Sequence, residues 1–165
     1  DRFMMKILVV YPTDEEEFVI VQRVTGPAVT VNAVATTDQL AALQRACRSV
    51  YVDPSLIQFA VRLVSATRTP EKHDLKELTR FITYGASPRA SINLTEGSRA
   101  LAMLRGRSYV LPEDMADLVP DVLRHRLVLS YEALSEGLSA DAIIAKITAK
   151  IPAPAKPREH EKLAA

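Results

Sequence analysis

The chain has 165 residues, a length that favours one domain, or one domain with an appendage, over a two-domain enzyme. With 48% hydrophobic and 25% charged residues, the composition is that of a globular protein and excludes wholesale disorder or a collagen-like repeat. The 21 basic residues nearly balance the 20 acidic ones, and a net charge of +1 is too small for the whole surface to attract nucleic acid or an acidic membrane.

The residues that usually bind metals are few and scattered. Cys47 is the one cysteine, so it cannot form an internal disulfide, and His73, His125 and His160 lack metal-ligand spacing. We therefore expect no metal site. No stretch approaches 18 apolar residues and no signal-peptide pattern opens the chain, so we also expect a cytoplasmic protein without membrane contact.

Residues 4–11 are apolar throughout except for Lys6, a pattern typical of a strand buried on both faces of a parallel sheet. Such a strand needs neighbouring strands, whereas most of the following sequence has helical periodicity. We therefore expect the chain to be cut from a longer protein whose sheet lies upstream. Without that sheet, residues 4–11 should be disordered, irregularly packed or paired with another copy.

Capping signals predict the helices that follow. The acidic run 14–17 opens a helix that Thr25-Gly26-Pro27 ends, and residues 29–35 then form a short strand or an extended linker. Five further helices are predicted at about residues 37–48, 54–67, 88–105, 112–123 and 140–150. Pro120 should kink or split the fourth of these, and residues 126–130 indicate a short strand.

The strongest candidate for chemistry is Arg89, in the segment Gly85-Ala86-Ser87-Pro88-Arg89. An arginine in the first turn of a helix opposes the helix dipole, a cost that a bound anion would cancel. The same helix end offers unpaired N–H groups, so Arg89 and the helix terminus together indicate a phosphate site. The alternative is a solvated arginine paired with an acidic residue of the same domain.

Two other groups of basic residues are weaker candidates for a functional site. Arg2 directly precedes the predicted strand, and residues at strand ends of α/β folds often face ligands. On position alone, Arg2 is better explained as a surface residue. Arg124, His125 and Arg126 end a predicted helix, where cations suit the negative end of the dipole without any further function.

At these residues the sequence resembles a known family. Residues 81–90 (FITYGASPRA), 99–110 (RALAMLRGRSYV) and 122–127 (VLRHRL) look like the C-terminal lid of MoxR-type AAA+ ATPases. The opening Asp1-Arg2-Phe3 and the strand followed by an acidic helix resemble the end of the preceding α/β nucleotide-binding domain. The resemblance covers residues 1 to about 154.

The resemblance implies a mainly α fold with three parts. Residues 1–35 would be a remnant of the α/β core, residues 36–151 a helical-bundle lid with a small β element, and residues 152–165 an extended tail with a vector-derived end. Arg89 matches the sensor 2 arginine, which contacts the γ-phosphate of ATP in its own subunit. Arg2 matches the position of the arginine finger, which reaches the neighbouring subunit's ATP.

The implied activity is ATP binding and hydrolysis with Mg²⁺ in a homo-oligomeric, hexameric ring that remodels or matures an unidentified client protein. This chain contains no phosphate loop of the form G-x-x-x-x-G-K-[ST], and the Walker B acids of the family are likewise missing, so alone it should bind no cofactor and be inactive. The alternative is a free-standing helical module for protein–protein interaction, which would need neither Arg2 nor Arg89. A helical DNA-binding domain ranks last, because Arg89, Arg99 and Arg105 are too dispersed to form a basic face.

Overall fold

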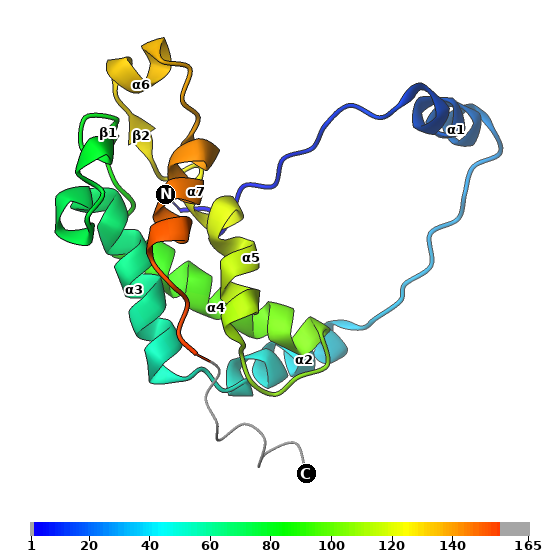
Figure 1. Cartoon of the computed structure of the whole chain (residues 1–165). Helices are drawn as coiled ribbons and strands as arrows, with labels where there is room; N and C mark the ends of the chain where they lie inside the picture. Colours follow the sequence, from blue (N-terminus) through cyan, green and yellow to red (C-terminus); the bar gives the residue numbers. More distant parts are fainter. Residues whose placement is uncertain (1, 156–165) are drawn as a thin grey trace.

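The computed structural model describes residues 2–155 and is mainly helical (Figure 1). Its α-helices are α1 (Asp14–Thr25), α2 (Thr37–Ser49), α3 (Pro54–Arg68), α4 (Pro88–Leu104), α5 (Pro112–Leu123), α6 (Tyr131–Ser135) and α7 (Ala140–Lys150). Two short 3₁₀ helices, η1 (Pro70–His73) and η2 (Lys76–Leu78), and two short strands, β1 (Ile82–Tyr84) and β2 (Val128–Leu129), complete the fold. No helix within these residues is long and apolar enough to cross a membrane.

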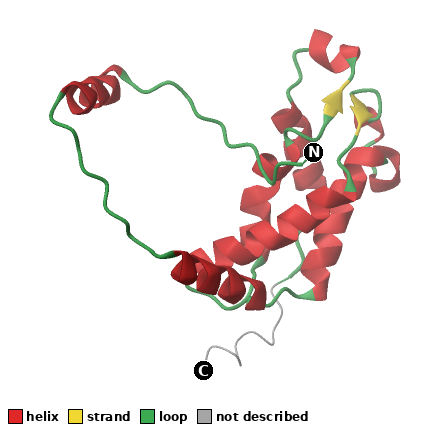
Figure 2. Cartoon of the chain, turned by 180° about the vertical axis from the view of Figure 1, so that it is seen from behind, coloured by secondary structure: helices red, strands yellow, loops and turns green. Residues whose placement is uncertain are grey.

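Helix α4 lies at the centre of the bundle. It packs against α2, α3 and α5, and α7 in turn packs against α3 and α5 (Figure 2). The largest fully buried side chains belong to these helices and to η2: Leu56, Phe59, Leu63, Leu78, Leu94, Met115, Leu123, Ile143, Ile144 and Ile147. Burying this apolar surface is the main stabilising contribution to the bundle.

The predicted β element is present, and it has a partner strand that the sequence did not reveal. β1 pairs antiparallel with β2, with Ile82 opposite Leu129 and Tyr84 opposite Val128. β2 falls inside the predicted segment 126–130. The prediction of a helical bundle with a small β element is therefore confirmed.

The amino-terminal segment lies away from this bundle. α1 begins with the capping box of Thr13 and Glu16 and buries none of its residues, and the figures show it apart from the other helices (Figures 1 and 2). Residues 7–13 and 27–34 run extended on either side of it without forming a strand. Residues 4–11 form no strand, as expected for this segment without its neighbouring strands, and the Lys6 N–H donates instead to the Asp121 carbonyl. Val10 and Tyr11 are 84% and 98% exposed.

Pro120 does not split α5, which excludes one of the two outcomes predicted for it. The helix runs from Pro112 to Leu123 through the proline, and the Arg124 N–H still donates to the Pro120 carbonyl at 2.9 Å. Interior proline costs about 3 kcal/mol. Burial of Met115, Val119 and Val122 on the same helix contributes about 1.5–3 kcal/mol each, which outweighs that cost.

Candidate functional site

The loop that leads into α4 is held by the end of α3. The Ala86 N–H donates to the Thr67 hydroxyl at 2.9 Å, and the Arg68 guanidinium donates to the Ala86 carbonyl at 3.2 Å. Gly85 lies so close to α3 that an added Cβ would stand 2.3 Å from the Thr67 carbonyl oxygen. This close approach requires glycine and fixes where α4 begins.

Ser87 caps α4 as predicted, and Arg89 follows in the first turn. The Ser87 hydroxyl accepts from the Arg89 N–H at 3.3 Å, which satisfies one amide of the helix N-terminus. Arg89 is exposed, with its positive charge beside the positive end of the α4 dipole. The structure thus places Arg89 where an incoming anion would meet both charges.

Arg126 lies close to Arg89 and is buried, with 6% of its surface exposed. Burial lowers the pKa of Arg126, and the positive charge of Arg89 lowers it further. The expectation that residues 124–126 are ordinary cations at a helix end is therefore wrong for Arg126. It sits in the protein interior, where its guanidinium donates to the main-chain carbonyls of Phe3 and Met4.

These contacts bring the Arg2 region to the same end of the bundle. Arg2 is exposed and directly precedes Phe3, whose carbonyl is bound by Arg126 and lies 3.2 Å from Nε2 of His125. Burial lowers the pKa of His125, which favours the neutral ring with Nε2–H as the donor. Arg126 therefore lies near Arg89 and also binds the residue that directly follows Arg2.

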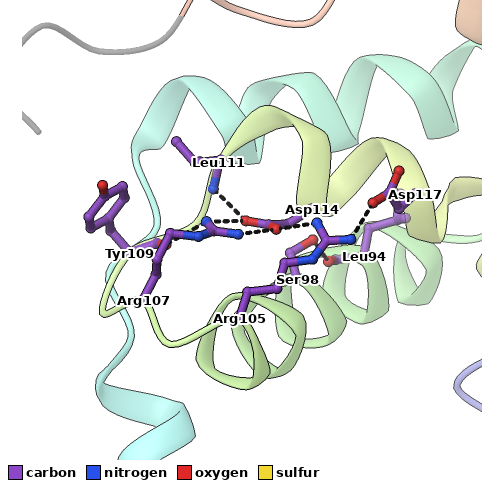
Figure 3. Close-up of polar contacts among 8 residues, drawn as sticks. All are labelled: Leu94, Ser98, Arg105, Arg107, Tyr109, Leu111, Asp114 and Asp117. Atoms are coloured by element: carbon purple, nitrogen blue, oxygen red, sulfur yellow. Dashed lines mark hydrogen bonds and ion pairs between the residues drawn. The ribbon is translucent and has the colours of Figure 1, made fainter.

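A second ionic cluster was missed at the sequence level. The carboxylate of Asp114 is fully buried and accepts from Arg105 at 2.8 Å, from Arg107 at 2.6 and 2.7 Å, and from the Leu111 N–H at 2.7 Å (Figure 3). Arg105 also reaches the exposed Asp117 at 2.7 Å. The one available signal was an acid three residues after Leu111, the spacing of a capping box. This cluster joins α4 to α5 and faces no other candidate residue.

The part of the chain that the structure describes holds no group of three or more His, Cys, Asp or Glu side chains that could bind a metal ion. The donor set at the α4 terminus consists of guanidinium groups and backbone amides. Such donors match the oxygens of a phosphate.

Comparison with known proteins places this arrangement in a family. The sequence profile of the AAA lid domain matches residues 75–147, which run from η2 through most of α7. The chain is 39% identical over 154 residues to the chaperone MoxR1 of Mycobacterium tuberculosis, covering 93% of this chain and 41% of that protein. It is 32% identical over 169 residues to the protein MoxR of Paracoccus denitrificans, covering 94% of this chain and 50% of that protein.

A solved structure agrees with these relatives. The crystal structure of a candidate ATPase from Cytophaga hutchinsonii superimposes with a TM-score of 0.88 at 36% sequence identity, covering 93% of this chain and 47% of that one. The chain thus spans half or less of the length of each of these relatives.

Proposed function

This chain belongs to the MoxR-type AAA+ ATPases, of which it forms the C-terminal, lid-containing part, and we propose that in the intact protein Arg89 contacts the terminal phosphate of ATP bound to its own subunit. One observation carries this proposal. An exposed arginine in the first turn of α4 lies beside a second, buried arginine, so that two positive charges and a helix N-terminus converge.

A phosphate oxygen near Arg89 would be attracted by both arginines and by the N-terminus of α4. The Arg89 guanidinium can donate two parallel N–H bonds to such an anion. These two bonds would hold the lid at one angle and would also raise its affinity for the phosphate. ATP with Mg²⁺ supplies the phosphoryl group that is transferred to water. Arg89 would then stabilise the charge on the phosphoryl oxygens and hold the lid closed until that charge leaves.

We further propose the domain division of the intact protein. Residues 1–35 would belong to the nucleotide-binding module, residues 36–151 would form the lid, and residues 152–165 would follow as a tail, of which residues 156–165 lie outside the described residues. The exposed apolar side chains of α1, such as Phe18 at 62% and Val24 at 77%, are what a helix shows when the rest of such a module covers it. Arg2 would act as an arginine finger toward the ATP of the neighbouring subunit in a hexameric ring.

ATP-driven closing and opening of the lid would allow the ring to remodel a client protein. A ring whose lids close and open with each ATP can pull on or reshape a bound partner, as the name chaperone given to the mycobacterial relative suggests. We propose that the intact protein acts in the cytoplasm on a client protein or complex.

The test uses the intact protein, with this chain joined to its upstream nucleotide-binding module. Steady-state ATP turnover and native mass are measured for wild type, Arg89→Ala and Arg2→Ala, with Arg62→Ala on the exposed side of α3 as the matched control. Loss of one charge-stabilising donor costs about 100-fold or more in kcat, so Arg89→Ala should fall by that factor while the ring persists. Unchanged turnover in Arg89→Ala would overturn the proposal.

Action of Arg2 across the subunit boundary has a separate test. Subunits with Arg2→Ala are mixed with subunits whose phosphate-loop lysine is replaced, each variant being inactive alone. If Arg2 serves the neighbour's ATP, the mixture regains turnover, because the second kind of subunit supplies Arg2 to the intact site of the first. No recovery in mixed rings would assign the finger to another residue.

A further inference from the structure

Four side chains of the bundle bind the main chain of residues 3–6, between 89 and 123 positions earlier in the sequence. Besides the contacts of His125 and Arg126 with Phe3, the Arg126 guanidinium reaches the Met4 carbonyl at 3.3 Å, and the Asn93 amide donates to the same carbonyl at 3.4 Å. The Arg124 guanidinium donates to the Lys6 carbonyl at 2.8 Å. In return, the Lys6 N–H donates to the Asp121 carbonyl at 2.8 Å. We call Asn93, Arg124, His125 and Arg126 the main-chain clamp.

The clamp residues are themselves held in place. Arg124 pairs with Asp121 on its own helix and with Asp141 of α7 at 3.0 Å, so its guanidinium is fixed between two helices. Asn93 stands on α4, one turn after Arg89. The clamp therefore connects the helix that carries Arg89 with the segment that carries Arg2.

The contacts between the clamp and the amino-terminal segment end at Lys6. Met5 is partly buried against the core, whereas Val9 is 91% exposed. Hydrogen bonds from charged donors to carbonyls are stronger than neutral ones. Arg124 and Arg126 are such charged donors, and the four clamp residues bind within a stretch of only four residues, so this stretch is attached to the bundle more firmly than the chain that follows.

We propose that the main-chain clamp positions Arg2 by tying its segment to the bundle where the nucleotide-binding module meets the lid, with Arg126 as the central positioning residue. A change in lid angle caused at Arg89 would then be transmitted through the clamp to the Arg2 segment. The effect on turnover rests on the proposed function, whereas the attachment of residues 3–6 is a property of this chain alone.

The attachment is tested by amide hydrogen exchange, followed by NMR, on the 165-residue chain without nucleotide. The Lys6 amide should be protected and the Val9 and Val10 amides should exchange freely. Asn93→Ala and Arg126→Lys should each speed Lys6 exchange at least tenfold, while Arg62→Ala leaves it unchanged. Arg126→Lys keeps the charge but replaces the planar guanidinium, whose Nη2 donates to both carbonyls, with a differently placed ammonium group.

Thermal unfolding by circular dichroism accompanies each variant, because Arg126 is buried and its replacement can destabilise the whole bundle. If Arg126→Lys unfolds, Asn93→Ala and His125→Ala, whose side chains are only half-buried, carry the test. Rapid exchange of the Lys6 amide in the wild-type chain, or equal protection in all folded variants, would overturn the proposal.

The consequence for catalysis is measured in the intact protein. Arg126→Lys should lower kcat at least tenfold while KM for ATP changes little, because the residue acts through the position of Arg2. If Arg126→Lys speeds exchange of the Lys6 amide but leaves kcat unchanged, the clamp does not act on catalysis and is only a structural attachment. If Arg89→Ala leaves ATP turnover unchanged while the Lys6 amide is protected, the proposed function is overturned but the attachment of residues 3–6 is not.

Discussion

Asp114 is a fully buried carboxylate whose charge is balanced by two arginines from the α4–α5 connection. Breaking a buried ion pair by removing one partner costs about 3–5 kcal/mol, since the remaining charge is left uncompensated. The exposure of Arg105 and Arg107 to solvent places the expected cost at the low end of that range.

We predict that Asp114→Asn lowers the free energy of unfolding by about 3 kcal/mol, measured by urea denaturation at neutral pH. The matched control is Asp117→Asn, which removes an exposed carboxylate that shares Arg105. The control should unfold at nearly the wild-type urea concentration. Equal losses in both variants would contradict the assignment of Asp114 as the centre of the cluster.

The same carboxylate makes the free energy of unfolding depend on pH in the acid range. Burial alone would raise the pKa of Asp114, but hydrogen bonds from Arg107, the Leu111 amide and Arg105 outweigh it and lower the pKa below its ordinary value. A carboxyl group with a depressed folded pKa stabilises the protein fully above its unfolded pKa of about 3.9, and this contribution is lost as the pH falls through the folded value.

We therefore expect unfolding free energy to fall steeply below about pH 4, with a shallower dependence in Asp114→Asn, which has no proton to take up at this position. Urea titrations at a series of pH values between neutrality and the acid limit measure the two slopes. Parallel curves for the two proteins would show that other carboxylates govern acid unfolding.

At the scale of elements, the contact between the end of α3 and the loop before α4 decides where Arg89 stands. We predict that Gly85→Ala lowers the unfolding free energy by about 1–3 kcal/mol, because its Cβ would collide with backbone atoms of Thr67 and Arg68. Thermal unfolding measures the loss. In the intact ATPase the folded variant should also turn over ATP more slowly than wild type.

The control for this prediction is Gly97→Ala on α4. A Cβ there lies 3.1 Å from Cδ1 of Leu118, the end of a side chain that can rotate away, and alanine favours the helix. Its stability should stay near that of wild type. A larger loss for Gly97→Ala than for Gly85→Ala would contradict the role assigned to the α3 contact.

Local signals predicted most of the helices because each helix start depends on a side chain two or three residues away. Ser139 accepts from Ala142, and α7 covers residues 140–150 as predicted. The Asp114 cluster and the clamp escaped prediction because they join residues whose contact depends on how helices pack. The clamp in addition ends on carbonyl oxygens, which every residue possesses.

At the scale of the whole molecule, α1 and its extended flanks add no buried side chain to the bundle. We predict that a chain beginning at residue 36 still unfolds cooperatively in urea, with a stability reduced only by the lost contacts of residues 3–6. It should also bind less of a dye that reports exposed apolar surface, because Phe18 and Val24 are gone. An unfolded product would show that residues 2–35 are required for the lid to fold.

The clamp binds three carbonyl oxygens of residues 3–6, and the Asp121 carbonyl beside it accepts from the Lys6 N–H. Nineteen of the twenty amino acids present that N–H identically at position 6. Side chains in this stretch can therefore change during evolution without loosening the attachment, while proline at position 6 cannot be accepted. Among homologues we expect the clamp side chains to stay constant opposite a variable segment. Constant clamp side chains and a variable segment at residues 3–6 show no correlated substitutions. Sequence comparison alone would therefore not reveal that the two are in contact.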